Sequence, residues 1–160
     1  MWNKNKSLLL SIIITVAILA ILTVLAIAMP WLLQLYIKLL NRIYTPTTVV
    51  LATFYSCVPF AYIVFGGLLK LLLNIRSNNV FTKKNTTLLR VIAWSCFVIS
   101  LICLVGGLWY MPFIIVGCAI FFIAVIIKVI RSVLTYGNEI KDDNDLTIWG
   151  EKWVLELILM

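Results

Sequence analysis

Residues 74–90 read NIRSNNVFTKKNTTLLR, and this polar stretch interrupts a chain of which 64% is hydrophobic. It carries four cations and no acidic residue, and long apolar runs flank it on both sides. Because Lys and Arg resist translocation, a basic gap between two apolar runs indicates a cytoplasmic loop. The stretch therefore predicts a membrane-spanning helix on each side of it, with its cations in the cytoplasm: Arg76, Lys83, Lys84 and Arg90.

The composition indicates an integral membrane protein. Only 12% of the 160 residues are charged, whereas a soluble domain carries about 25%. The net charge of +7 comes from residues at the ends of apolar runs, which favours anionic lipid headgroups over nucleic acid as the counter-charge. The sequence contains no histidine, which excludes imidazole catalysis and His-ligated metals.

Four apolar runs predict an all-α membrane bundle of four spans in a single domain, residues 1–148. Each run is long enough to cross about 30 Å of hydrocarbon as a helix. The first run has 22 uncharged residues, which is longer than the core of about 7–15 residues in a cleavable signal peptide. The last helix is expected to continue into the cytoplasm and to stop at Gly137. The spans are predicted at about residues 8–29, 47–73, 88–109 and 113–136.

Two prolines bear on these spans. Pro30 is expected to bend or end the first helix. The segment Trp31–Tyr44 then has two interpretations, an interfacial helix on the outer leaflet or a tilted continuation of the first span. Pro59 within the second span is typical of an ordinary kink, and the alternative is the broken helix of a transporter.

The distribution of cations predicts that both termini lie in the cytoplasm. The N-terminal tail, the central connector and the C-terminal segment hold eleven Lys and Arg between them. The opposite side holds two, Lys38 and Arg42. Cationic loops stay on the cytoplasmic side, so this asymmetry orients the chain.

Small residues recur on one face of the third predicted span. Helices associate in lipid through close packing, so this stripe predicts a helix-packing face. The alternative, a ligand-lining groove, is less favoured because the stripe carries no charge. At the start of this helix, Thr82 and Asn85 resemble a capping box with Asn in place of Glu. The stripe consists of Ala93, Cys96, Ser100, Cys103 and Gly107.

No catalytic, cofactor or metal site is predicted. Membrane enzymes and proton-coupled exporters need an ionisable group within the bilayer, and the central parts of the four runs contain no Asp, Glu, Lys or Arg. The cysteines form no C-x-x-C pair and lie within apolar runs, which favours a packing role: Cys57, Cys96, Cys103 and Cys118.

All six acidic residues follow the last span, on the same side as the basic stretch. The segment Glu139–Asp145 is therefore a candidate to dock on Arg76, Lys83, Lys84 or Arg90, and the alternative is a solvated tail, because exposed ion pairs contribute only about 0–1 kcal/mol. The candidate cytoplasmic interaction residues are Arg76, Phe81, Thr82, Asn85, Arg90, Glu139, Asp142 and Asp145.

Several local motifs lie within residues 79–147. They are Asn79-Val80-Phe81-Thr82 with Asn85, Leu89-Arg90-Val91-Ile92, Tyr110-Met111-Pro112-Phe113, Glu139-Ile140-Lys141 and Asn144-Asp145-Leu146-Thr147. Together they resemble one family of small bacterial membrane proteins, the domain-of-unknown-function family two-nine-seven-five. The resemblance implies four spans, a place in the bacterial cytoplasmic membrane, a gene often beside that of a small Cro-type helix-turn-helix regulator, and no known activity. The chain departs from the family at Lys83-Lys84, where relatives usually carry acidic residues.

The last residues, 149–160, read WGEKWVLELILM and extend past the point where relatives tend to stop. Trp149 to Lys152 can be encoded by a purine-rich ribosome-binding sequence, followed by an ATG in another frame. We hypothesise that this tail is translated intergenic sequence overlapping a regulator gene. The alternative is an amphipathic tail resting on the membrane surface.

The leading functional hypothesis is a non-enzymatic membrane component of a small regulatory pair, which senses a membrane state or binds a partner through its inner loops. The expected partners are membrane lipid and a small helix-turn-helix regulator, without direct binding of nucleic acid. The alternative is a transport or export accessory, or a protein that protects the cell against membrane-active peptides.

Overall fold

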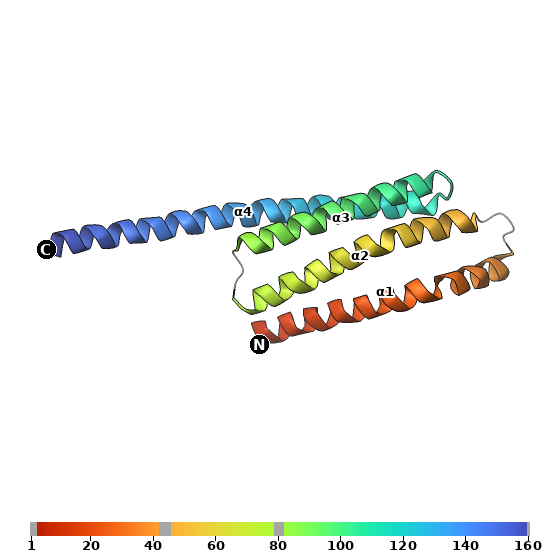
Figure 1. The fold of residues 1–160 in the computed structure, drawn as a ribbon, viewed down its shortest axis with the longest axis horizontal. Coiled ribbons are helices and arrows are strands. Elements are labelled where there is room, and N and C mark those ends of the chain that lie inside the picture. The colour runs from red at the N-terminus through yellow and green to blue at the C-terminus, as the bar shows by residue number, and fades with distance from the viewer. Residues whose placement is uncertain (1–2, 42–45, 79–81, 160) are drawn as a thin grey trace.

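The computed structural model describes residues 3–41, 46–78 and 82–159, with the backbone alone for residues 145–149. These residues form helices and connections, with no strand among them. All four helices are long and apolar enough to cross a membrane, which confirms the predicted all-α fold with four spans. The helices are α1 (Lys4–Leu40), α2 (Thr47–Arg76), α3 (Lys83–Gly107) and α4 (Pro112–Leu159) (Figure 1).

The two prolines within helices do not interrupt them. Pro30 lies inside α1, which continues to Leu40 and ends at Asn41 with a left-handed φ of 50°. The sequence predicted that Pro30 bends or ends the helix, and the prediction of an end is wrong. Residues 31–40 continue α1 rather than forming a separate interfacial helix, and residues 42–45 lie outside the described residues. Likewise α2 passes through Pro59 without a break, unlike the broken helix of a transporter.

The predicted stop at Gly137 is wrong, because α4 runs through this residue to Leu159. A glycine inside a helix costs only about 1 kcal/mol relative to alanine. It ends a helix where it adopts a positive φ, and no described glycine in this chain does so. The helix is 48 residues long, which corresponds to roughly 72 Å at the usual rise per residue.

The helices pack in the order of the chain. Close backbone contacts join α1 to α2, α2 to α3 and α3 to α4, and no other pair of helices within the described residues. The buried core lies where the last three helices meet, around Ile92, Cys96 and Ala124, with Val64 of α2 packed against it. Within residues 3–41, 46–78 and 82–159, α1 packs against α2 alone, so most of its surface faces outward.

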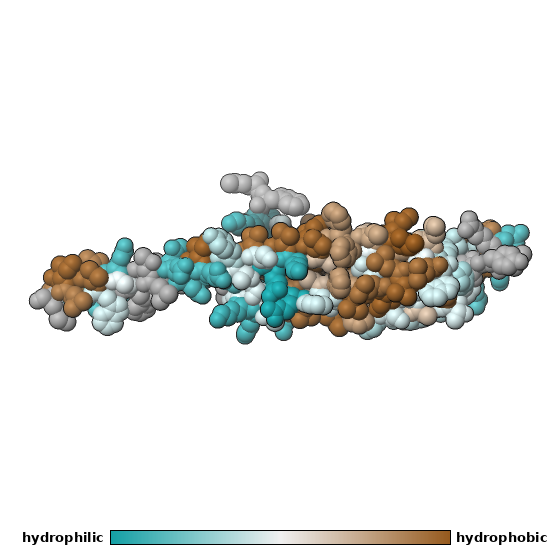
Figure 2. Space-filling model, turned by 90° about the horizontal axis from the view of Figure 1, so that it is seen from above, coloured by the Kyte–Doolittle hydropathy of each residue, from teal (hydrophilic) through white to brown (hydrophobic). Residues whose placement is uncertain are grey.

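One end of the helix array carries the N-terminal start of α1, the end of α2 and the start of α3 (Figure 1). From this end α4 continues well past the other helices (Figure 1). Seen from above, hydrophobic atoms cover much of the array, hydrophilic atoms gather where α4 leaves it, and hydrophobic atoms return at the tip of α4 (Figure 2). This banding is the pattern expected of a chain that crosses a bilayer.

Candidate functional site

Small residues allow α3 and α4 to form a close hairpin. A Cβ added to Gly107 would lie 2.9 Å from the backbone nitrogen of Ile114, and one added to Gly117 would lie 3.0 Å from Leu104. The hydroxyl of Ser100, which is fully buried, donates to the backbone carbonyl of Gly117 at 2.8 Å. Close approach and interhelical hydrogen bonds are the main forces between helices in lipid.

The predicted stripe of α3 faces its neighbours along most of its length. Cys96, Ser100, Cys103 and Gly107 are buried. The fifth member, Ala93, is half-buried and lines a groove between α3 and α4. On the side toward α2, the sulfur atoms of Cys103 and Cys57 lie 3.9 Å apart.

An amide pair joins α2 to α3 at the end where their connection lies. The side chain of Asn74 donates to Oδ1 of Asn85 at 2.9 Å. Asn85 is only 1% exposed, so water cannot replace this bond. Thr82 is the N-cap residue of α3, as predicted, but its side chain makes no capping hydrogen bond. The N-cap position was therefore predicted correctly, but the predicted capping hydrogen bond from the Thr82 side chain is absent.

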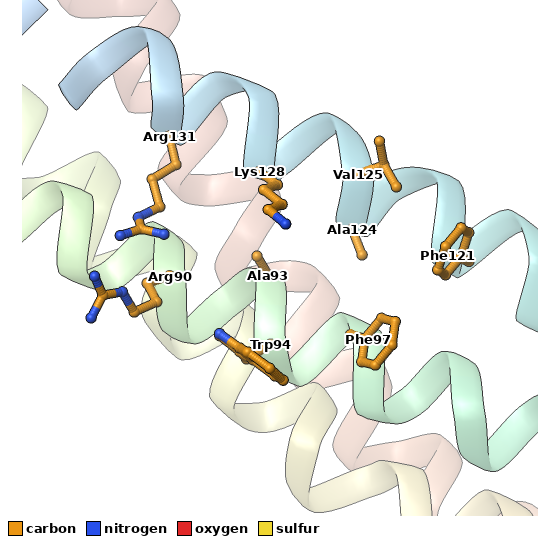
Figure 3. Close-up of a pocket in the computed structure, with 9 residues that line it drawn as sticks. All are labelled: Arg90, Ala93, Trp94, Phe97, Phe121, Ala124, Val125, Lys128 and Arg131. Carbon is orange, nitrogen blue, oxygen red and sulfur yellow. The ribbon is translucent and has the colours of Figure 1, made fainter. Parts of the chain in front are cut away.

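The most distinctive feature of the structure is the cationic groove between α3 and α4, with a volume of about 270 Å³. Arg90 of α3 and Arg131 of α4 turn their guanidinium groups toward one another, and Lys128 lies one turn away on α4 (Figure 3). Deeper along the two helices the lining becomes aromatic and aliphatic (Figure 3). The nine lining residues are Arg90, Ala93, Trp94, Phe97, Phe121, Ala124, Val125, Lys128 and Arg131.

The three cations of the groove have no acidic partner among the described residues. The first acidic residue of the whole chain is Glu139, which lies eight positions beyond Arg131, or roughly 12 Å of helix. Nε of Arg131 is buried and has no hydrogen-bond acceptor within the part of the chain that the structure describes. Two facing guanidinium groups repel one another in the absence of an anion, so the groove is electrostatically suited to a negative ligand.

The other candidate interaction residues do not form one cluster. Arg76, Glu139 and Asp142 are exposed. α4 continues past the start of α3 (Figure 1). Glu139 and Asp142 lie further from the hairpin turn than Lys83, the first residue of α3, so they have no α3 residue beside them. The structure does not bring these two carboxylates to Arg76 or Arg90 in an ion pair. Phe81 lies outside the described residues, as does the side chain of Asp145.

The grouping of Arg90 with Lys128 and Arg131 was not predicted from the sequence. A signal for it exists in the short turn between α3 and α4. In an antiparallel hairpin, residues equally distant from the turn lie side by side. Arg90 lies 20 positions before Tyr110 and Arg131 lies 21 positions after it, so the turn alone places these residues at the same level.

Among the described residues, no group of three or more His, Cys, Asp or Glu side chains could hold a metal ion. The hydroxyl groups near α1 take part in structural hydrogen bonds. Buried Thr15 donates within α1 to the backbone of Ser11 at 2.8 Å, and the exposed hydroxyls of Thr23 and Tyr62 join α1 to α2 at 2.8 Å.

The four apolar helices, with charge gathered at one end, define the class of protein: an α-helical membrane protein with several spans. Within that class, the chain belongs to the family described as Protein of unknown function (DUF2975), whose profile matches residues 9–148. The resemblance noted in the sequence is thereby confirmed at the level of the family. No curated protein and no solved structure gives a significant match to the chain.

Proposed function

We propose that this protein is the non-enzymatic membrane component of a small regulatory pair in the bacterial cytoplasmic membrane. Both termini lie in the cytoplasm, and the protruding part of α4 binds a small helix-turn-helix regulator. The observation that carries the proposal is the continuation of α4 as one helix to Leu159, past the end of the array (Figure 1). Spans without acidic or basic residues in their central parts support a non-enzymatic role.

The length of the protruding helix suits a binding surface. Lys83, the first residue of α3, lies 27 positions before Tyr110. The same distance after Tyr110 reaches Gly137, so residues 138–159 have no α3 partner beside them. They extend roughly 33 Å at the usual helical rise, which gives a partner access to every side of the helix.

The charge of this segment suits a regulator that binds DNA. Residues 139–145 contain four acidic residues and one lysine, and the exposed side chains include Glu139 and Asp142, with Ile140 45% exposed between them. Proteins that bind DNA carry a basic surface. An acidic helix complements that surface and competes with DNA for it, so binding at the membrane would hold the regulator away from its operator.

The test is a binding titration with the purified regulator encoded by the neighbouring gene and the full chain in lipid nanodiscs. We expect saturable binding that weakens at least tenfold when Glu139→Lys and Asp142→Lys are combined, because each reversal places like charges opposite one another. The matched control is Glu151→Lys, an exposed acidic residue of the same protruding helix that lies outside the acidic run of residues 139–145. Absence of binding to the parent chain, or equal weakening in the control variant, overturns the proposal.

A further inference from the structure

We propose that the cationic groove between α3 and α4 is a specific site for one anionic phospholipid of the inner leaflet. This inference does not depend on the regulator or on the protruding part of α4. It rests on the three cations of the groove, on their depth in the membrane and on the apolar lining beside them.

The cations are arranged for a phosphate group. Arg90 and Arg131 approach the groove from two different helices and face one another, and Lys128 lines the groove one helical turn further along α4 (Figure 3). The planar guanidinium fork matches the oxygen atoms of a phosphate in pairs. A phosphate between the two forks would remove their mutual repulsion and supply an acceptor for the buried Nε of Arg131, which has none among the described residues.

The depth of these residues matches that of a lipid headgroup. Arg131 lies 19 positions after Pro112, the first residue of α4, or roughly 28 Å along the helix. Arg90 lies 17 positions before Gly107, the last residue of α3, or roughly 26 Å. The hydrocarbon core of a bilayer is about 30 Å thick. Both guanidinium groups therefore reach the level at which the hydrocarbon meets the phosphates.

The remainder of the groove suits the glycerol and the upper acyl chains of a lipid. Trp94 is 64% exposed beside Arg90, and an indole at this level is typical of the membrane interface. Phe97, Phe121 and Val125 follow toward the membrane centre and are also exposed, so the groove opens sideways into lipid. A soluble anion would gain nothing from this apolar wall, whereas a phospholipid contacts it and the cations together.

The site is distinguishable from general attraction between cations and the membrane surface. Arg76 is exposed near the same end of the array but does not line the groove. Basic pockets between spanning helices on the cytoplasmic side recognise acidic headgroups, and each Lys or Arg near the surface contributes about 1 kcal/mol. A contribution of about 1 kcal/mol corresponds to a factor of about five in the affinity for the lipid.

The experiment measures lipid binding to the purified full chain by native mass spectrometry. The probes are phosphatidylglycerol and phosphatidylcholine with identical acyl chains, and inorganic phosphate alone. We expect phosphatidylglycerol to bind selectively, and Arg90→Gln and Arg131→Gln to weaken its binding about fivefold each. Arg76→Gln should retain the parent affinity. Inorganic phosphate should neither bind measurably nor displace the lipid.

A second pair of variants tests the shape of the groove without changing its charge. Ala93→Phe fills the groove from α3 and should abolish the preference for phosphatidylglycerol. Ala119→Phe adds the same side chain at an exposed position of α4 outside the groove and should bind as the parent chain does. Equal binding of both lipids, equal loss in Arg76→Gln, displacement by inorganic phosphate, or no difference between the two alanine variants overturns the proposal.

Discussion

Gly107 lies at the end of α3, where the chain turns toward α4, and it is buried against Ile114. A Cβ at this position would approach both the side chain and the backbone of Ile114. The backbone nitrogen of Ile114 also donates to the carbonyl of Met111 at 3.0 Å, which holds it in the turn. The neighbour therefore cannot move aside by changing a rotamer.

We predict that Gly107→Ala lowers the free energy of unfolding by about 1–3 kcal/mol, the usual cost of overpacking a close contact. Unfolding by SDS in mixed micelles measures the effect. Gly66→Ala is the matched control, because nothing lies within 4 Å of a Cβ added there. This control should be neutral or stabilising by up to about 1 kcal/mol, since alanine favours the helix. A similar loss in both variants contradicts the predicted packing.

Single residues also show what the sequence can and cannot predict. Cys96, Ser100 and Cys103 were placed on one packing face by helical spacing, and all three are buried. Asn85 was read as a local cap, whereas its Oδ1 accepts a bond from Asn74 on another helix. Spacing within one helix identifies a face of that helix, but a partner 11 residues away depends on how two helices meet.

At the scale of elements, the connection between α2 and α3 depends on the Asn74–Asn85 hydrogen bond. This amide pair lies at one end of both helices, away from the Cys57–Cys103 contact nearer their other end. Asn85 is buried, so water cannot readily replace the hydrogen bond that its Oδ1 accepts from Asn74. The bond should therefore determine how closely the two helices stay together at this end.

A double-mutant cycle tests this role. We predict that Asn74→Ala and Asn85→Ala each cost about 1–3 kcal/mol of unfolding free energy, as loss of a buried hydrogen-bond partner does. Combined, they should cost less than the sum of the two by about 0.5 kcal/mol or more. The control cycle pairs Asn74→Ala with Thr87→Val, since the hydroxyl of Thr87 bonds within its own helix to Lys83. Additive effects in the first cycle exclude a direct coupling.

The existence of the helices followed from the apolar runs, because a span must satisfy its backbone hydrogen bonds internally. Their ends were harder to predict. α2 begins at Thr47, where the second run was expected to begin. In contrast, α4 continues 22 residues past the expected stop at Gly137. Gly137 does not adopt the positive φ that would end the helix. The hypothesis that residues 149–160 are translated intergenic sequence stays a prediction for the nucleotide sequence to test.

At the scale of the whole molecule, charge asymmetry should determine the orientation in the membrane. The end of α2 and the exposed turn between α3 and α4 lie at opposite ends of the array (Figure 1). Ser77 follows α2 at the cationic end, and Met111, which is 79% exposed, lies in the turn. If both termini are cytoplasmic, only Met111 faces outward.

Cysteine labelling in intact cells measures this orientation. We predict that a membrane-impermeant maleimide labels Met111→Cys at once and labels Ser77→Cys only after the membrane is permeabilised. The parent chain supplies the background, since its four cysteines lie within the helices that span the membrane. Immediate labelling of Ser77→Cys in intact cells would show that the chain has the opposite orientation, and a cytoplasmic partner would then have no basis.

The cationic groove is a feature of the whole molecule that was not predicted from the sequence. Arg90 and Arg131 belong to different apolar runs, and each alone is an ordinary cation at the edge of a span. Their pairing depends on the register of the hairpin, which the close approach at Gly107 and the bond from Ser100 to Gly117 hold in place. Hydropathy predicts the number of membrane-spanning helices, whereas the contacts between small side chains determine which of these helices pack together and in what register.

The packing of each helix against its predecessor along the chain has a consequence for biosynthesis. A segment leaving the translocon finds the only earlier partner that it needs already in the bilayer. Assembly can therefore keep pace with translation, and no early helix has to wait for the last one to arrive. A ribosome that stalls after α3 would leave three helices already docked in their final order.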